Sequence, residues 1–175
     1  MLNFNKLSGA KKMLEGIRVI ELEGIGPGPF AGMTLADLGA DVVKVHRPSP
    51  TQEDKKETLS LLDRGKRSVI LNLKDQKDKH TLKGLIKGAD VLIEGHRPGV
   101  MERLGFDEKT VFELNPNIIF GRITGWGQGG PNATQAAHDL NYISKTGSLW
   151  FSSNEGDNPF TCLLYTSDAA DERLR

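Results

Sequence analysis

Apolar, β-branched residues gather in five short runs along this chain, and the segments between the runs carry helical patterns. The runs occupy residues 18–22, 41–45, 68–73, 90–94 and 118–123. The spacing of apolar and capping residues predicts helices after the first run and over 74–87, 100–104 and 107–115. Alternation of strands and helices favours an α/β fold.

The first two runs and the helix between them form a βαβ unit within residues 18–48. The segment Gly24–Phe30 is rich in Gly and Pro and predicts a turn, and Gly39 is placed to end the helix. Five residues share one helical face, which we expect to be buried: Phe30, Ala31, Thr34, Leu35 and Leu38. Charged and turn-forming residues over 49–60 predict a surface loop.

This unit departs from a dinucleotide-binding fingerprint in two places. Pro29 stands where G-x-G-x-x-G requires its third glycine. The second strand ends in His46-Arg47, whereas an NAD site needs an acidic residue there. An arginine at this position suits an adenosine phosphate, so the 2′-phosphate of NADP and the 3′-phosphate of coenzyme A both stay open. A packing turn followed by a surface arginine, with no ligand at all, also stays open.

The composition excludes several classes of protein. Among the 175 residues, 23 basic side chains balance 23 acidic ones, so no overall attraction for nucleic acid or an anionic membrane is expected. No apolar run approaches the roughly 18 residues of a membrane-spanning helix. The single cysteine, Cys162, suits a reducing compartment and predicts a cytoplasmic protein. Residues 1–13 lack the apolar stretch of a secretory signal and are interpreted as an N-terminal extension.

Two further stretches contain residues suited to chemistry. The tetrad His96-Arg97-Pro98-Gly99 follows the fourth strand, at the edge where open α/β sheets bind ligands. A glycine-rich segment follows the fifth strand over 124–130, and His138-Asp139 comes just before an apolar segment of helical character. A histidine in this position can serve as a general base, although a structural or solvated histidine is more common.

Four segments carry a more specific signal. They read ELEGIGPGPFAGMTLADLGADVVKVHRP, DRGKRSVILNLK, DVLIEGHRPGVMERLG and ITGWGQGGP…AHDLNY, in that order. Together they resemble the family III CoA-transferase superfamily, and most of all its α-methylacyl-CoA racemase branch. The resemblance covers residues 14–161 and identifies them as part of a CoA-binding large domain, which implies a Rossmann-like, doubly wound and mainly parallel sheet. It also implies a smaller second domain and an interlocked homodimer.

The resemblance assigns the binding of coenzyme A to particular residues. Arg47 would contact the adenosine phosphate end, and Leu71 and Lys74 would line the path of the adenine and pantetheine groups. Arg97 and Arg103 would hold the diphosphate. The assignment agrees with the chemistry of arginine, because its planar guanidinium binds phosphates bidentately.

At the reacting end, His138 matches the family's catalytic histidine, and Asp139 and Tyr142 would flank the thioester. The implied reaction epimerises a 2-methyl-branched acyl-CoA: one group removes the α-proton, and a second returns a proton to the other face of the enolate. No metal or redox cofactor is required, and coenzyme A is the carrier of the substrate. Ala137 stands where the family usually has a glycine.

After Thr161 the chain departs from the family pattern. Residues 162–175 lack the glycines and phenylalanine that flank the family's second catalytic aspartate, and we interpret them as a non-native tail. Asp168 matches that aspartate by spacing only. Three functions follow as expectations. The first is a racemase of which this truncated chain is an inactive part. The second is a family III transferase that moves CoA between carboxylic acids, and the third is an inactive CoA-binding fragment.

Overall fold

A computed structural model describes residues 12–48 and 60–152 of the chain. The segments interpreted as an N-terminal extension, a surface loop over 49–60 and a tail over 162–175 lie wholly or largely outside these residues. The chain divides into two compact units. The first is Met1–Gly95 with Met101–Arg122, and the second is His96–Val100 with Ile123–Arg175.

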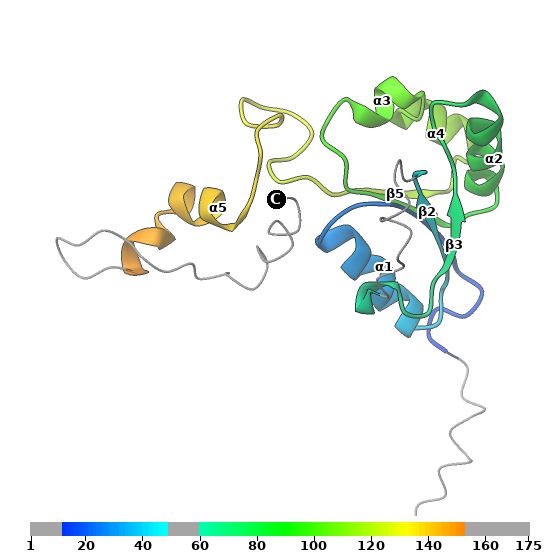
Figure 1. Ribbon diagram of the computed structural model, residues 1–175, viewed down its shortest axis with the longest axis horizontal. Helices are drawn as coiled ribbons and strands as arrows, with labels where there is room; N and C mark the ends of the chain where they lie inside the picture. The colour runs from blue at the N-terminus through cyan, green and yellow to red at the C-terminus, as the bar shows by residue number, and fades with distance from the viewer. Residues whose placement is uncertain (1–11, 49–59, 153–175) are drawn as a thin grey trace, which may run out of the picture. The chain divides into compact units, whose positions relative to one another are not determined.

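Within the described residues, five parallel strands form the sheet of the first unit, in the order β3-β2-β1-β4-β5 (Figure 1). The strands are β1 Arg18–Leu22, β2 Asp41–His46, β3 Arg67–Ile70, β4 Val91–Glu94 and β5 Ile119–Arg122. All neighbouring pairs are parallel. An order with the first strand at the centre is that of Rossmann-like sheets, so the predicted α/β fold is confirmed.

Helices cover both faces of this sheet (Figure 1). They are α1 Pro27–Asp37, the short 3₁₀ helix η3 Leu61–Asp63, α2 Gln76–Lys87, α3 Val100–Leu104 and α4 Glu108–Leu114. The chain first runs outwards from β1 through β2 to β3, and α1 and η3 lie together on one face. It then crosses back to β4 and β5. Right-handed crossovers therefore place α2 and α4 together on the opposite face.

Most buried apolar side chains pack between the sheet and the helices α2 and α4. This core consists of Ile20, Leu22, Val45, Leu71, Leu82, Ile86, Ala89, Leu92, Met101, Phe106, Val111 and Ile118. Because side chains alternate along a strand, Glu21 of β1 and Lys44 of β2 face the other side, under α1. The two residues are direct neighbours in the β1–β2 register. The face under α1 is therefore partly polar, although both side chains are buried.

The buried face of α1 differs from the predicted one. The helix buries Gly28, Pro29, Gly32, Met33 and Ala36. Phe30 and Leu38, which were predicted to be buried, are 58% and 38% exposed. The cause lies in the sheet beneath the helix, since a Cβ atom on residue 32 would overlap the carboxylate of Glu21. Small residues let α1 approach this polar part of the sheet, and Phe30 and Leu38 face outwards.

Several helix ends agree with the sequence. Gly39 has a φ of 105° just beyond α1 and ends the helix as predicted. Asp107 caps α4, because its Oδ1 accepts a hydrogen bond from the Thr110 backbone N–H at 2.6 Å. The helix α2 begins two residues later than predicted, after the capping residue Asp75.

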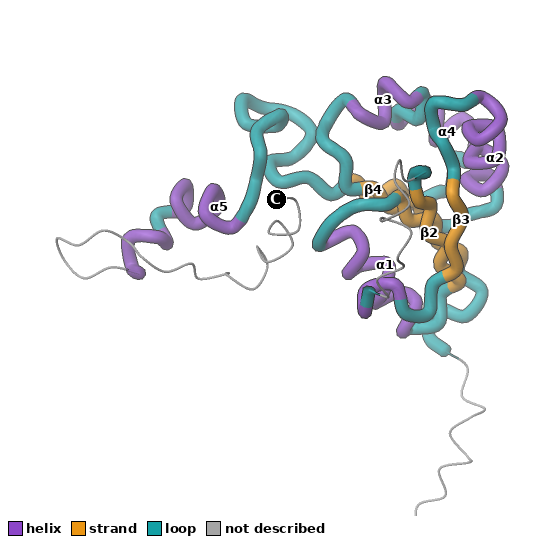
Figure 2. The backbone as a smooth tube through the Cα atoms, viewed as in Figure 1, coloured by secondary structure: helices purple, strands orange, loops and turns teal. Residues whose placement is uncertain are grey.

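The described residues of the second unit lie largely in loops (Figure 2). Residues 123–138 form irregular turns, and they lead into α5 Asp139–Thr146 and the 3₁₀ helix η4 Ser148–Ser152. The helix predicted after His138 is thus present. Across residues 12–48 and 60–152, no helix is long and apolar enough to cross a membrane.

Candidate functional site

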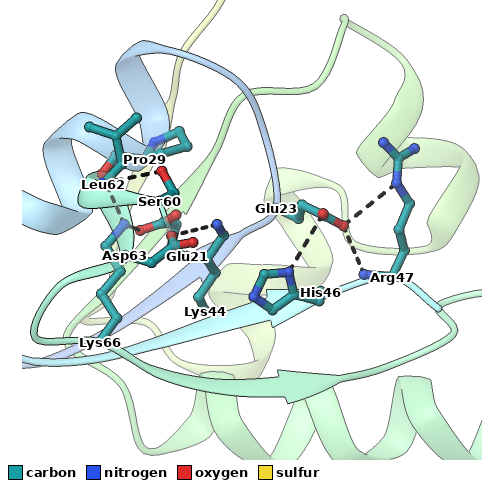
Figure 3. A network of polar contacts seen from close by, with 10 residues as sticks. All are labelled: Glu21, Glu23, Pro29, Lys44, His46, Arg47, Ser60, Leu62, Asp63 and Lys66. Atoms are coloured by element: carbon teal, nitrogen blue, oxygen red, sulfur yellow. Dashed lines mark hydrogen bonds and ion pairs between the residues drawn. The ribbon is translucent and has the colours of Figure 1, made fainter. Parts of the chain in front are cut away.

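Arg47 lies directly beyond β2, at the carboxyl edge of the sheet, and its side chain is 87% exposed. Its backbone N–H donates a hydrogen bond to Glu23 Oε2 at 2.9 Å, and its Nε lies 3.6 Å from the same oxygen. The other carboxylate oxygen, Glu23 Oε1, lies 3.5 Å from His46 Nδ1 (Figure 3). One carboxylate at the end of β1 thus contacts both residues at the end of β2. Glu23 was not among the predicted site residues.

Leu71 and Lys74 follow β3 at the same edge of the sheet. The Leu71 backbone N–H donates to His46 O at 2.8 Å, which fixes the end of β3 beside the end of β2. The Leu71 side chain, however, is 5% exposed and belongs to the apolar core. A ligand at this edge therefore meets the backbone of Leu71 and not its side chain. Lys74 lies in the turn before α2 and is exposed.

Arg103 lies on α3 and is exposed. A neighbouring arginine, Arg122, has a side chain that is only 9% exposed and contacts the same helix. Arg122, at the end of β5, donates from Nε to Glu94 Oε1 at 2.9 Å. It also pairs with Glu102 of α3 at 2.9 Å and with Glu108 of α4 at 3.3 Å. Burial acts to lower the pKa of Arg122, but the bonds to the three carboxylates outweigh it and raise the pKa.

A second buried ionic cluster lies under α1 (Figure 3). Lys66 Nζ lies 2.5 Å from Glu21 Oε2 and donates to the Pro29 carbonyl oxygen at 2.9 Å. Lys44 Nζ lies 2.6 Å from Asp63 Oδ1. Burial raises the pKa of Glu21, against the opposing effect of Lys66. The sequence analysis did not predict this cluster. The one feature that could have indicated it is Glu21, a charged residue within the otherwise apolar first strand.

In the second unit, His138 is the N-terminal capping residue of α5 and is exposed. The Asn141 side chain accepts a hydrogen bond from the His138 backbone N–H at 3.0 Å, which fixes the backbone where the helix begins. The next residue, Asp139, is 3% exposed. Two predicted site residues thus lie at the start of one helix, with the imidazole outside and the carboxylate inside.

Tyr142 lies one turn further along α5 and packs against the glycine-rich loop. Its ring centroid lies 5.0 Å from that of Trp126, and its hydroxyl donates to the Ala137 carbonyl oxygen at 3.4 Å. Burial raises the pKa of the Tyr142 hydroxyl. A Cβ atom on Gly125 would overlap the Cβ of Ala137 and come within 2.7 Å of the Tyr142 hydroxyl oxygen. The methyl group of Ala137 therefore packs against a glycine.

Arg97 also belongs to the second unit and is exposed. It lies in a tight turn, in which Val100 N–H donates to the Arg97 carbonyl oxygen at 3.1 Å and Gly99 has a φ of 86°. The predicted site residues are thus divided between the units. Arg47, Leu71, Lys74 and Arg103 belong to the first unit, and Arg97, His138, Asp139 and Tyr142 to the second.

The parallel sheet, the helices on both faces and the exposed arginine at the carboxyl edge define a Rossmann-like α/β protein with an edge suited to a phosphate-bearing ligand. The particular family follows from comparison with known proteins. The chain belongs to CoA-transferase family III, because the model of that family matches residues 14–171. The predicted family is confirmed.

Individual relatives are similar over most of this chain. It is 42% identical over 156 residues to the alpha-methylacyl-CoA racemase of Mus musculus, which covers 89% of this chain and 39% of the racemase. It is 38% identical over 138 residues to the acetyl-CoA:oxalate CoA-transferase of Acetobacter aceti. This match covers 74% of this chain and 36% of the transferase. The crystal structure of Rv3272 from M. tuberculosis matches with a TM-score of 0.77 at 32% identity. This match covers 94% of this chain and 47% of the Rv3272 chain. The chain spans about two fifths of the length of these curated relatives.

Proposed function

We propose that this chain is the coenzyme A-binding part of an α-methylacyl-CoA racemase. The observation that carries the proposal is the 42% identity to the racemase of Mus musculus. The position of His138 at the start of α5 supports it further, because the imidazole is exposed where a substrate can reach it. A transferase that works through an acyl anhydride on an aspartate has no need of this histidine.

In the proposed reaction, His138 removes the α-proton from one face of a 2-methylacyl-CoA. The electron pair of the broken C–H bond moves toward the thioester carbonyl and gives a planar enolate. A second acid then returns a proton to the opposite face of the carbon, which gives the other enantiomer with no net change in charge. Each such proton transfer gains typically about 10²–10⁴-fold from a positioned acid or base. The second acid lies outside the described residues, where Asp168 is a candidate by spacing alone.

The same proposal assigns the binding of coenzyme A. The exposed guanidinium of Arg47 binds the 3′-phosphate of the adenosine, and Lys74 with the backbone of Leu71 lines the path that follows. Arg97 and Arg103 bind the diphosphate. Asp139 and Tyr142 flank the thioester from the α5 side. The reaction itself needs neither a metal nor a redox cofactor, because it moves only protons.

The proposal extends to the whole protein. We expect a cytoplasmic homodimer with a smaller second domain, in which residues 14–161 form part of the large domain. Because the chain spans about two fifths of its racemase relative, the 175 residues alone are expected to bind CoA at most and not to racemise it. A fragment that only binds CoA is the interpretation that remains if the longer protein shows neither racemase nor transferase activity.

A family III CoA-transferase is the second candidate, and the 38% identity to the acetyl-CoA:oxalate CoA-transferase supports it. Such an enzyme transfers CoA from a thioester to a free carboxylate. The two candidates differ in what they do to the α-carbon, since only the racemase exchanges its proton with solvent.

The test uses the full-length protein that carries this sequence, in D₂O, with each enantiomer of a 2-methylacyl-CoA. A racemase incorporates deuterium at the α-carbon of both enantiomers. The His138→Ala variant should lose the exchange of one enantiomer far more than that of the other, because the imidazole serves one face. Transfer of CoA to a free acid without exchange would identify a transferase, and retention of both exchanges in the variant would exclude His138 as the base.

A further inference from the structure

We propose that Glu23 is a positioning residue for Arg47, which it holds so that the outer edge of the guanidinium faces the terminal adenosine phosphate of coenzyme A. This inference rests on the proposed function, because it needs a phosphate at Arg47. It assigns a role in recognition to a residue at the end of β1 that the sequence pattern did not single out.

The geometry divides the guanidinium into two sides. Its Nε lies 3.6 Å from Glu23 Oε2, and the same oxygen accepts the Arg47 backbone N–H at 2.9 Å. The two Nη groups point away from this carboxylate (Figure 3). Among the described residues, Glu23 is the only hydrogen-bonding or ion-pairing partner of the Arg47 side chain. The edge that binds a phosphate bidentately is therefore left for a ligand.

Glu23 itself is held firmly. Its backbone N–H donates to the Val45 carbonyl oxygen at 2.9 Å, which continues the pairing of β1 with β2 beyond the last strand residue. Its second oxygen, Oε1, lies 3.5 Å from His46 Nδ1, and the Glu23 side chain is 33% exposed. A carboxylate with contacts on both oxygens can restrict a long side chain that is 87% exposed. Because Glu23 restricts the Arg47 side chain before binding, less conformational entropy is lost when a phosphate binds.

The negative charge of Glu23 has an opposite effect, because it repels a phosphate. This repulsion acts across solvent, where charge interactions at exposed sites are weak. It also acts with or without Arg47, whereas positioning requires Arg47. A double-mutant cycle between the two residues therefore separates the two effects.

The experiment measures the dissociation constants of CoA and 3′-dephospho-CoA by calorimetry in the full-length protein. The variants are E23Q, R47A and the double variant, and the ratio of the two constants is the readout. The glutamine keeps an oxygen for the Arg47 backbone N–H, so the fold should hold. We expect E23Q to reduce the preference for CoA by about 3–10-fold, and to have no such effect in the R47A background. The matched control is E15Q, which removes one exposed carboxylate before β1, at the opposite edge of the sheet.

Each other outcome has a definite meaning. If the unsubstituted protein prefers CoA and E23Q leaves the ratio unchanged, the positioning role is wrong and the proposed function stands. If E23Q tightens CoA binding by the same factor in the unsubstituted protein and in the R47A background, Glu23 acts by repulsion alone and the inference is wrong. If the unsubstituted protein does not distinguish CoA from its 3′-dephospho form, both the assignment of Arg47 and the role of Glu23 are overturned.

Discussion

Lys66 Nζ lies 2.5 Å from Glu21 Oε2, and the two side chains are 1% and 0% exposed. The pair connects the residue before β3 with β1. The same ammonium group donates to the Pro29 carbonyl oxygen at 2.9 Å, in the first turn of α1. One buried lysine thus contacts β1 and the start of α1, which lie 45 and 37 residues before it in the sequence. These contacts fix the start of α1 and, with it, the turn between β1 and α1.

Replacing Lys66 by Met should destabilise the protein strongly, because it leaves the Glu21 carboxylate buried without its partner. We expect a loss of about 3–5 kcal/mol in the free energy of unfolding at neutral pH. Urea denaturation measures this loss. The control is K109M, which removes an exposed lysine that is paired only with Glu113 across one turn of α4 among the described residues, and it should change the free energy little.

The effect of K66M should depend on pH. Burial already raises the pKa of Glu21 above its ordinary value of 4.5, and loss of Lys66 removes an opposing contribution. A raised carboxyl pKa means that the folded state binds the proton more tightly than the unfolded state. The stability that the Glu21 proton contributes is therefore greatest below pH 4.5 and is lost as the pH rises through the folded-state pKa of Glu21. The destabilisation by K66M should accordingly be smaller near pH 4.5 than at about pH 8, and an equal loss at both would mean that Glu21 is not the group responsible.

Gly32 should not tolerate a side chain, although it lies within a helix. A Cβ atom there would overlap the Glu21 carboxylate, which the buried Lys66 holds in place. We expect G32A to cost about 1–3 kcal/mol in unfolding free energy. In G84A, on α2, the added methyl group meets open space, and the gain in helix propensity should stabilise by about 0.4–1 kcal/mol. Thermal or urea unfolding should therefore show a lower free energy of unfolding for G32A and a higher one for G84A. A stabilising G32A would show that α1 does not approach β1 through this glycine.

Arg122 should be as sensitive as Lys66, for the same physical reason at the other end of the sheet. The variant R122M leaves Glu94, which is 0% exposed, without the guanidinium that binds it. We expect a loss of about 3–5 kcal/mol in unfolding free energy. The variant R122K keeps the charge but cannot reach three carboxylates at once, so it should give an intermediate loss. A lysine variant as stable as the unsubstituted protein would mean that charge alone, and not the branched contact, stabilises this site.

The strands and most helix ends could be predicted from the sequence, because they depend on local residues. The β-branched runs, Gly39 and the capping residue Asp107 each act within a few positions of themselves. The buried face of α1 could not be predicted, since it depends on Glu21, a residue of another element. Periodicity favoured Phe30 and Leu38, whereas the contact between Gly32 and the sheet decides the orientation.

The same distinction applies to the candidate site. Arg47 was found because the end of the second strand is a known position for binding a phosphate. Glu23 was missed because its contact with Arg47 depends on the register of β1 against β2, which no single stretch reveals. Lys66 was missed as well, because only the folded sheet brings Glu21 within reach of it.

Gly125 should be required in the glycine-rich loop, and Gly129 should not. A Cβ atom on residue 125 would overlap that of Ala137 and approach the Tyr142 hydroxyl, whereas one on residue 129 meets nothing within 4 Å. We expect G125A to displace the loop from α5 and to cost about 1–3 kcal/mol of local stability. The fluorescence of Trp126, which packs at 5.0 Å from Tyr142, reports this displacement. G129A should leave the emission spectrum unchanged.

A second substitution makes this prediction specific. In the double variant G125A/A137G, the methyl group opposite residue 125 is removed and the main overlap disappears. The Tyr142 hydroxyl lies at the end of a side chain that can shift slightly, so it should not prevent the recovery. Because a displaced loop would also shift the start of α5, G125A should reduce the exchange at the α-carbon in the full-length protein. We therefore expect A137G to restore most of this exchange and of the original Trp126 emission. If A137G restores neither, the loop and the start of α5 do not pack through this pair, and the position of His138 does not depend on it.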